Sequence, residues 1–358
     1  MAGWGGDVIP LAVIGGGQIG LRHIQVALAS EKVRLVGVVE PNEARRAQLA
    51  QQGLPTVVAI SDLPTETQAA IVATPTPNHF DASHEALDAG LSLIVEKPLT
   101  ATPDEGRQLI SAAQRRGLPL YCGHHRRCHP FSLAARKALL ELGPLVGIQA
   151  LWSLRKHDSY FDVPWRRAPG AGPLMTNLSH EIDLMRFFAG EITEVTALTS
   201  NATRGLVIED TAALAFRFAS GTLASVLISD AGASPWAFEA GSGENPDIAV
   251  SGEDYLRVTG TQGALAFPSL THWNGGDHES VDWRKALTRF VLAPPHKVDP
   301  LFEQLERFAS VLEGKTDDVL CTAEEGLAAA EWTLAVALSA KLRRATNRTD
   351  VPGNFQGV

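Results

Sequence analysis

Short apolar runs recur along the first third of the chain, and glycine or proline breaks and helix-like stretches separate them. The runs occupy residues 9–14, 33–39, 69–73, 92–95 and 118–122. Apolar runs of this length, rich in β-branched residues, are typical of buried strands, and their alternation with helical segments is the pattern of a parallel, doubly wound sheet. The first part of the chain therefore predicts an α/β domain whose strands are parallel.

The pattern changes after about residue 125. A helix predicted over residues 130–142 is followed by strand-like segments with turn residues between them. These segments occupy residues 147–154, 195–199, 212–218, 222–229, 255–259 and 263–267. Their spacing predicts a largely antiparallel sheet, with closing helices at 300–312 and 323–344 packed beside it. We therefore predict two domains, residues 1–125 and residues 126–358.

A glycine-rich loop joins the first apolar run to the first helix. Residues 13–20 read VIGGGQIG, which fits the pattern G-x-G-x-x-G in the strand-to-helix context that dinucleotide binding requires. The first glycine would form the tight turn, the second would let the backbone approach a pyrophosphate, and the third would let the helix pack against the strand. The N–H groups at the helix start would also attract phosphate. The predicted cofactor-binding residues of this loop are Gly15, Gly17, Gln18, Ile19 and Gly20.

An acidic residue, Glu40, ends the second apolar run about 20 residues after the loop, which is the expected separation. A carboxylate at this place can accept hydrogen bonds from both ribose hydroxyls and would repel a 2′-phosphate. Glu40 therefore favours NAD over NADP, although Arg45 and Arg46 close by leave NADP open. The alternative is that Glu40 is only a solvent-exposed strand end.

Polar loops follow three later apolar runs, at residues 74–79, 96–98 and 123–127. Binding residues in parallel sheets lie just after the carboxyl ends of the strands, so these loops are predicted to converge on one crevice. The second loop, Glu96-Lys97-Pro98, would place a lysine beside the cofactor. The predicted cofactor contacts in these loops are Thr74, Thr76, Asn78, His79, Glu96 and Lys97, and the predicted substrate contacts are Lys97, His124 and Arg127.

The composition is that of a globular protein long enough for two domains, with 358 residues of which 45% are hydrophobic and 20% charged. A net charge of −9 without a long basic run argues against nucleic acid and anionic membranes as partners. Residues 1–7 do not resemble a signal peptide, and no apolar stretch reaches the roughly 20 residues that span a bilayer. These features predict a cytoplasmic protein that acts on a small molecule.

Three cysteines cannot all pair, and a disulfide framework is not expected. Two of them, Cys122 and Cys128, lie with three histidines in residues 122–129, and this crowding could suggest a metal site. No second, distant ligand pair accompanies the segment, and Arg126 and Arg127 within it would repel a cation. We therefore predict no metal site.

A helix is predicted over residues 174–188, after Gly170-Ala171-Gly172-Pro173 and before Gly190. At about 100° per residue, its apolar residues form one arc that would face the core. A second arc carries polar residues, as a substrate-lining helix would; these are Thr176, Asn177, His180 and Asp183. The alternative is ordinary amphipathicity with a histidine that is satisfied in the core.

Together, these motifs resemble the glucose-fructose oxidoreductase/inositol dehydrogenase/MocA-like (Gfo/Idh/MocA) oxidoreductases over nearly the whole chain. The resemblance rests on the glycine loop, Ala73-Thr74-Pro75 with Asn78 and His79, Glu96-Lys97-Pro98, Arg126-Arg127, Trp165-Arg166 and His180-Glu181-Ile182-Asp183. It implies an α/β fold class, in which an N-terminal Rossmann dinucleotide-binding domain is followed by a C-terminal α+β domain with a large open, mostly antiparallel sheet. Such a sheet often forms the oligomer interface, so a homodimer or homotetramer is expected.

The resemblance also implies reversible hydride transfer between NAD(P) and a secondary carbinol of a sugar, polyol or related cyclic hydroxy compound. Lys97 and His180 would be the catalytic residues, and either one could act as the base. Trp165 and Arg166 would contribute to both cofactor and substrate binding. Inositol-dehydrogenase-like members have an aspartate four residues before the histidine, whereas this chain has Thr176, so an aspartate-assisted proton relay and inositol itself are less safe expectations.

Several other functions fit the same residues. Arginines such as Arg127 and Arg166 would suit a cyclic hydroxy acid or an aromatic dihydrodiol as the substrate. The same fold could hold NAD tightly through a redox-neutral cycle. A nucleotide-binding sensor without catalysis is a further alternative, against which Lys97 and His180 weigh.

Overall fold

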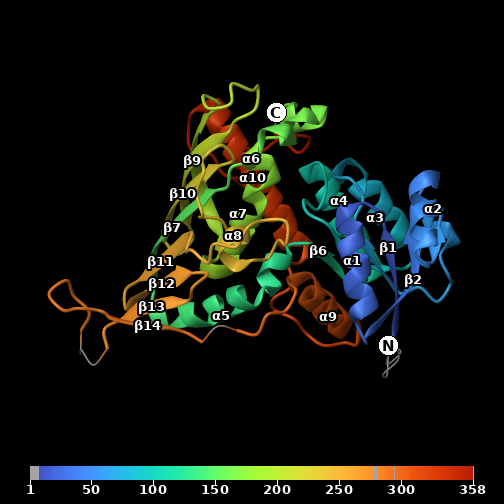
Figure 1. Cartoon of the computed structure of the whole chain (residues 1–358), viewed down its shortest axis with the longest axis horizontal. Helices are drawn as coiled ribbons and strands as arrows, with labels where there is room; N and C mark the ends of the chain where they lie inside the picture. The colour runs from blue at the N-terminus through green and yellow to red at the C-terminus, as the bar shows by residue number, and fades with distance from the viewer. Residues whose placement is uncertain (1–7, 277–279, 294, 358) are drawn as a thin grey trace. The chain divides into compact units, whose positions relative to one another are not determined.

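The computed structural model describes residues 8–276, 280–293 and 295–357. The chain divides into two compact units (Figure 1). The first unit contains the residues up to Cys128 together with Val298–Ala330, and the second contains His129–Lys297 and the residues from Glu331 onwards. Each unit has its own sheet, and each is described separately below.

A parallel sheet forms the centre of the first unit. The strand order is β3-β2-β1-β4-β5-β6, and every pairing is parallel. The strands are β1 Ile9–Ile14, β2 Val33–Val39, β3 Thr56–Val57, β4 Ala69–Val72, β5 Ser92–Val95 and β6 Leu120–Cys122. Five of these strands coincide with the predicted apolar runs, and only β3 was not anticipated. The order reverses beside β1, which places a ligand-binding crevice at the carboxyl ends of β1 and β4.

Helices connect the strands of the first unit, and local sequence explains where they begin and end. They are α1 Gln18–Ala29, α2 Glu43–Gln51, α3 His79–Asp88 and α4 Pro103–Arg116, with short 3-10 helices η1 Ile60–Asp62, η2 Thr76–Asn78 and η3 His125–Cys128. In α4, Thr102 and Glu105 form a reciprocal capping box, and Gly117 ends the helix in the left-handed conformation.

The closing helices divide between the two units. Helix α9 (Pro300–Leu312) packs on α1 and η3 of the first unit. The backbone of Cys122 donates a 2.8 Å hydrogen bond to the Cys321 carbonyl, so the segment before α10 (Ala323–Leu342) extends the edge of the parallel sheet. The sequence-based division had placed residues 298–330 with the second domain; these long-range contacts group them with the first unit instead.

The second unit is built on an eight-stranded sheet of order β14-β13-β12-β11-β7-β10-β9-β8. The strands are β7 Leu145–Ser153, β8 Ile192–Ser200, β9 Thr211–Phe218, β10 Leu223–Ser229, β11 Leu256–Gly260, β12 Gly263–Phe267, β13 Thr271–Asn274 and β14 Thr288–Val291. All pairings are antiparallel except that of β7 with β10. The predicted fold class is thereby confirmed, while β13 and β14 were not anticipated.

Helices lie against one face of this sheet (Figure 1). In the second unit they are α5 Pro130–Leu139, η4 Leu140–Leu142, α6 Pro173–Thr176, α7 Leu178–Ala189, α8 Phe238–Ser242 and the end of α10, with η5 Asp158–Asp162, η6 Pro164–Arg167 and η7 Arg348–Asp350 in the connections. Along β9, buried and exposed residues alternate, so the strand has one covered and one open face. No helix in the described ranges is long and apolar enough to cross a membrane.

Candidate functional site

The glycine loop of the first unit forms an open cradle between β1 and α1. Gly15 has φ +105°, a conformation that residues with a Cβ rarely adopt, and a Cβ on Gly20 would overlap the carbonyl oxygen of Gly15. A Cβ on Gly17 would meet nothing within 4 Å. Gly17 is the N-cap of α1, and no side chain caps the helix. No capping side chain therefore competes with a diphosphate for the N–H groups at the start of α1.

Glu40 lies after the carboxyl end of β2, next to this cradle. Its Oε2 accepts a 3.0 Å hydrogen bond from the Gly16 N–H, and its Oε1 accepts one of 2.9 Å from the Asn42 N–H. Two arginines of α2 bind backbone nearby, with Arg45 Nε 2.7 Å from the Gly16 carbonyl oxygen and an Arg46 nitrogen 2.9 Å from that of Glu40. The carboxylate is thus held at the loop rather than pointing into solvent.

The loop after β4 is tied to the Glu96-Lys97-Pro98 loop through a buried histidine. The ring nitrogens of His79 lie 2.8 Å from the Pro98 carbonyl oxygen and 2.9 Å from that of Thr74. The hydroxyl of Thr74 is buried and has no hydrogen-bond partner among the described residues. Thr76 and Asn78 belong to η2, where Thr76 is half-buried and Asn78 is exposed. His79 therefore holds two loops together at the crevice, and Thr74 has hydrogen-bonding capacity left for a ligand.

Glu96 is a buried carboxylate directly after β5. His23 Nε2 of α1 lies 2.8 Å from Glu96 Oε1, and the Lys97 N–H donates to Oε2 at 3.2 Å. Burial opposes ionisation of Glu96, but the hydrogen bond from His23 and the nearby charges of His23, His125 and Lys97 outweigh it and lower the pKa of Glu96 to about 2. Glu96 is therefore an anion that fixes the backbone at Lys97.

At the carboxyl end of β6, Gly123 packs closely against Glu96. A Cβ on Gly123 would lie 3.0 Å from the Glu96 Cα and 3.2 Å from its Oε1, which is tighter than most side-chain contacts. The predicted substrate residues His124 and Arg127 follow, and both are buried. A guanidinium nitrogen of Arg127 lies 2.7 Å from Glu325 Oε2 at the start of α10. Arg127 thus takes part in an ion pair within the first unit.

These observations agree with NAD as the cofactor of the first unit. An open helix start, a carboxylate at the end of β2 and the spare hydroxyl of Thr74 all lie at the carboxyl ends of the parallel strands, where dinucleotides bind in such sheets. Groups of three or more metal-binding side chains are absent from the described residues. The glycine loop, Glu40 and Thr74 are the residues that would hold NAD.

In the second unit, the predicted helix over residues 174–188 is interrupted. Helix α6 ends at Thr176 and α7 begins at Leu178, because Asn177 between them has φ −120° and ψ −39°. The Asn177 carbonyl oxygen accepts the His180 N–H at 3.3 Å, so His180 lies one turn into α7. His180 and Asp183 are buried, as is Glu181, which the helical periodicity did not explain. The structure therefore places Asn177 and His180 on neighbouring turns.

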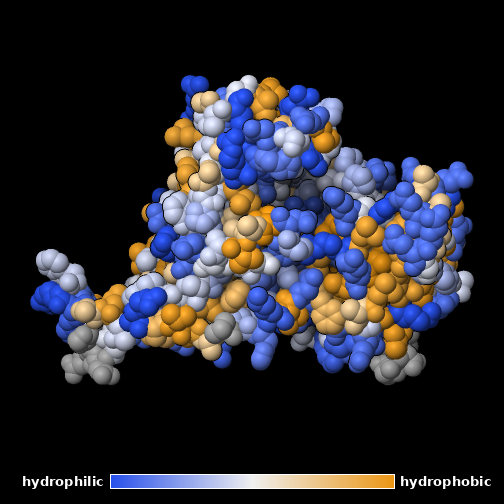
Figure 2. Space-filling view, in the orientation of Figure 1, coloured by the Kyte–Doolittle hydropathy of each residue, from blue (hydrophilic) through white to orange (hydrophobic). Residues whose placement is uncertain are grey.

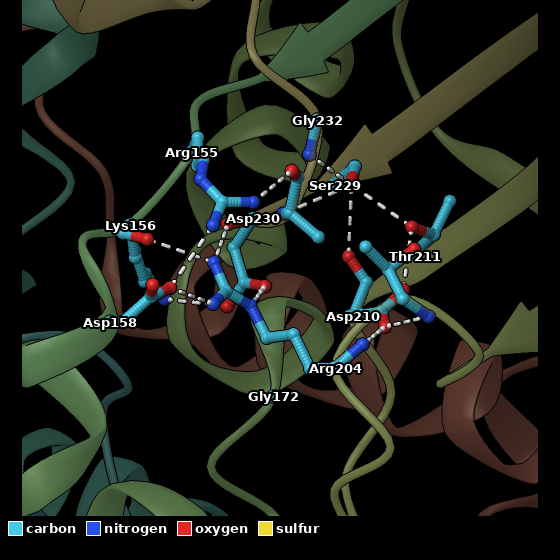
Figure 3. Close-up of polar contacts among 12 residues, drawn as sticks. Arg155, Lys156, Asp158, Gly172, Arg204, Asp210, Thr211, Ser229, Asp230 and Gly232 are labelled. Carbon is cyan, nitrogen blue, oxygen red and sulfur yellow. Dashed lines mark hydrogen bonds and ion pairs between the residues drawn. The ribbon is translucent and has the colours of Figure 1, made fainter.

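A lysine that the sequence reading missed lies against this break. Lys156 Nζ is 3.2 Å from Asn177 Oδ1, 3.5 Å from Thr176 Oγ1 and 3.3 Å from Asp230 Oδ2. Figure 3 shows Lys156 in a cluster that also contains Arg155, Asp158 and Arg204. Burial lowers the pKa of Lys156, against the opposing effect of Asp230. In the sequence, Lys156 could have been recognised because it comes just after the predicted strand 147–154, as the polar residues of the other site loops come just after their strands.

The segment with Trp165 and Arg166 lies between Lys156 and Asn177 in the chain, and Arg166 contacts the same aromatic ring as Lys156, that of Tyr160. The Arg166 guanidinium carbon is 4.1 Å from the centre of the Tyr160 ring, and Lys156 Nζ is 4.9 Å from it. Trp165 is 58% exposed. Within the second unit, Arg166 is therefore close to Lys156 through Tyr160, whereas Trp165 points largely to solvent.

Comparison with known proteins identifies the family of both halves. Residues 9–124 match the family model described as "Oxidoreductase family, NAD-binding Rossmann fold", and residues 134–266 match the GFO/IDH/MocA C-terminal domain. These two matches cover most of the chain. They confirm the resemblance, the Rossmann domain and the NAD-binding character that the motifs predicted.

Individual relatives agree with this assignment. The rhizopine catabolism protein MocA of Rhizobium meliloti is 31% identical over 196 residues, which cover 54% of this chain and 61% of that protein. An inositol 2-dehydrogenase of Arthrobacter is 27% identical over 310 residues, covering 81% and 88%. In three dimensions, the UDP-N-acetylglucosamine 3-dehydrogenase of Acidithiobacillus ferrooxidans superposes with a TM-score of 0.75 at 23% identity, covering 94% and 99%, which shows a shared fold. The chain therefore belongs to the GFO/IDH/MocA family of oxidoreductases with an NAD-binding Rossmann fold.

Proposed function

We propose that the protein is an NAD-dependent dehydrogenase that oxidises a secondary alcohol of a sugar, a polyol or a related cyclic hydroxy compound. Relatives that bear the names of inositol and nucleotide-sugar dehydrogenases support this class of substrate. The observation that carries the proposal is Lys97, fixed by the buried Glu96 carboxylate at the carboxyl end of β5. NAD supplies the acceptor for the hydride that leaves the carbinol carbon.

The chain's own contribution would be to hold the alcohol and remove its proton. The Lys97 ammonium would donate a hydrogen bond to the substrate oxygen and stabilise the negative charge that develops on it. His180 would accept the hydroxyl proton, because an imidazole titrates near working pH. Asn177 and Thr176, on the turn before His180, would orient the neighbouring hydroxyl groups. Lys97 is the other candidate for the base.

Two substitutions test these roles. In Lys97→Met, turnover should fall by orders of magnitude while the affinity for NADH, measured by fluorescence titration, stays within about threefold. In His180→Asn, the part of the pH profile of kcat/KM that reflects titration of the imidazole should disappear. A Lys97→Met enzyme with ordinary turnover would refute the assignment of Lys97. An unchanged pH profile in His180→Asn would identify Lys97 as the base.

The preference for NAD over NADP is part of the same proposal and rests on Glu40. Its two carboxylate oxygens lie beside the glycine loop, in hydrogen bonds to backbone N–H groups at 3.0 and 2.9 Å. When NAD binds, these oxygens would exchange backbone partners for the ribose hydroxyls. A 2′-phosphate at this position would meet a like charge, which costs affinity.

We also propose that the open face of the eight-stranded sheet forms the interface of a homodimer or homotetramer. Cross-strand pairing places Leu198, Ala213, Leu227 and Leu151 in one row over four strands, and Leu198 and Leu227 are 69% and 41% exposed. Figure 2 shows hydrophobic residues along the rim of the second unit where this sheet is seen from the side. Apolar rows of this kind are typical of self-association surfaces. Light scattering can measure the subunit number of wild type and of Leu227→Asp. A monomeric wild type would refute the proposed interface.

A further inference from the structure

The Lys156 ammonium is only loosely held by its neighbours. Its three oxygen neighbours lie at 3.2, 3.3 and 3.5 Å, whereas charge-assisted N–H···O bonds are usually about 2.7–2.9 Å long. Two of the three, Asn177 Oδ1 and Thr176 Oγ1, are neutral. The ammonium therefore has only one charged partner among these contacts, and that contact is long; a second carboxylate, Glu209, acts on it from a greater distance.

This charged partner, Asp230, also serves a second cation. Arg204 Nε lies 3.4 Å from Asp230 Oδ1, and another Arg204 nitrogen donates to the Asp230 carbonyl oxygen at 2.6 Å (Figure 3). Arg204 donates further to the Lys156 carbonyl oxygen at 2.9 Å and lies 3.3 Å from Asp158. Arg204 is thus held mainly by backbone carbonyl oxygens, at 2.6 and 2.9 Å, and it would remain beside the Asp230 carboxylate if the lysine were lost.

Lys156 and Asp230 differ in how much of each side chain is exposed. The Lys156 side chain keeps 14% of its surface exposed, against 1% for Asp230. The Asp230 carboxylate is therefore shielded from a ligand, whereas part of the Lys156 side chain is open to one. The Tyr160 ring, 4.9 Å from Nζ, forms an aromatic wall beside it. A cation with a flat wall and two neutral hydrogen-bonding side chains is suited to a carboxylate group.

We propose that Lys156 binds a carboxylate of the substrate, so that the preferred substrate is a cyclic hydroxy acid rather than a neutral sugar or polyol. The inference rests on the proposed function, because it places the carboxylate next to Asn177, one turn from His180. An added anion also offsets the burial of the ammonium, since burial alone disfavours its charged form. Lys156 is then a specificity residue: it binds the carboxylate next to the reacting alcohol, while Lys97 and His180 act on the alcohol itself.

Matched substrate pairs test this. D-galacturonate and shikimate are each compared with their methyl esters, which keep the hydroxyl pattern and remove the charge. With NAD and the full-length protein, we expect wild type to prefer at least one acid over its ester by tenfold or more in kcat/KM. In Lys156→Met, the KM of the acid should rise by tenfold or more, with kcat and the kinetics of the ester changing less than threefold. Lys156→Arg should recover part of the affinity for the acid.

Arg155→Gln is the matched control. Arg155 is the preceding residue and carries the same charge, but its guanidinium binds the Ala231 carbonyl oxygen and Asp158. The acid preference should therefore survive in this variant. Equal loss for acid and ester in Lys156→Met would mean a structural role, and equal use of acids and esters by wild type would also overturn the inference.

Calorimetric titration of the NADH-bound protein separates failure of this inference from failure of the proposed function. If no compound is oxidised, but the acids still bind wild type at least tenfold more tightly than Lys156→Met, the carboxylate site stands and the dehydrogenase proposal falls. If compounds are oxidised and Lys156→Met changes the kinetics of acids and esters equally, the dehydrogenase proposal stands and the carboxylate site falls. Absence of acid binding in wild type refutes the carboxylate site.

Discussion

The buried contact between His23 and Glu96 should contribute substantially to the stability of the first unit. His23 is 1% and Glu96 6% exposed, and Nε2 and Oε1 are 2.8 Å apart. His23→Ala would remove the neighbour while the carboxylate stays buried. A buried charge that loses its partner is costly, because water cannot replace the lost hydrogen bond.

The magnitude follows from the pKa of Glu96, which is lowered from 4.5 to about 2 although burial alone would raise it. At about 1.4 kcal/mol per pKa unit, this corresponds to about 3 kcal/mol of stability at neutral pH. Because the pKa is lower in the folded state, the contribution is present above pH 4.5 and is lost as the pH falls from 4.5 through about 2. Without His23, burial dominates, so the carboxyl should protonate at a higher pH.

Hydrogen exchange in increasing urea is the appropriate assay, because exchange reports on each segment and so follows the first unit by itself. Amides of α1 and β5 in His23→Ala should lose about 3 kcal/mol of protection at pH 7. His84→Ala is the control: His84 and Asp88 form an ion pair of 3.1 Å, with side chains 40% and 50% exposed. Its removal should change protection by less than about 1 kcal/mol.

A double-mutant cycle with Glu96→Gln isolates the pair from the packing of the imidazole. A coupling free energy of about 2 kcal/mol or more at pH 7 is expected, decreasing as the pH is lowered from 4.5 towards 2. A coupling below about 0.5 kcal/mol, or one that does not change over this pH range, would refute the reasoning. Equal loss of protection in His23→Ala and His84→Ala would do the same.

Two further predictions concern the cofactor cradle. Glu40→Ser should raise the ratio of kcat/KM for NADP to that for NAD by tenfold or more in steady-state assays. The substitution removes the anion that opposes a 2′-phosphate, while Arg46 stays 2.9 Å from the backbone carbonyl oxygen of residue 40. An unchanged ratio would mean that Glu40 does not contact the ribose. Gly20→Ala should abolish NADH binding in fluorescence titrations, because its Cβ would overlap the Gly15 carbonyl oxygen. Gly147→Ala in β7, where a Cβ would meet only ordinary contacts at 3.4 Å or more, should leave binding unchanged.

The sequence determined the architecture of the first unit nearly strand by strand. Buried parallel strands are continuous apolar runs, so β1 and β4 could be located from hydrophobicity alone. The glycine loop could be recognised because its conformation excludes other residues, as Gly15 and Gly20 illustrate. Hydrophobic runs and conformational constraints of this kind involve only a few neighbouring residues, so a single sequence is enough to recognise them.

Long-range packing decided the rest. Helix α9 belongs to the first unit because it packs on α1, which no local pattern encodes. The predicted helix over residues 174–188 breaks at Asn177, where the side chain accepts from Lys156 Nζ, a residue 21 positions earlier in the chain. Local periodicity carries no information about such a partner.

The chemistry of the candidate site divides in the same way. Sequence motifs predicted Lys97 and His180 as the catalytic residues, through the resemblance to the family. Only the tertiary structure showed that His23 keeps Glu96 ionised in the interior and that Asp230 is shared by Lys156 and Arg204. The charge and hydrogen bonding of a side chain depend on neighbours that are distant in sequence, because burial makes every unpaired polar group costly and folding decides which groups meet.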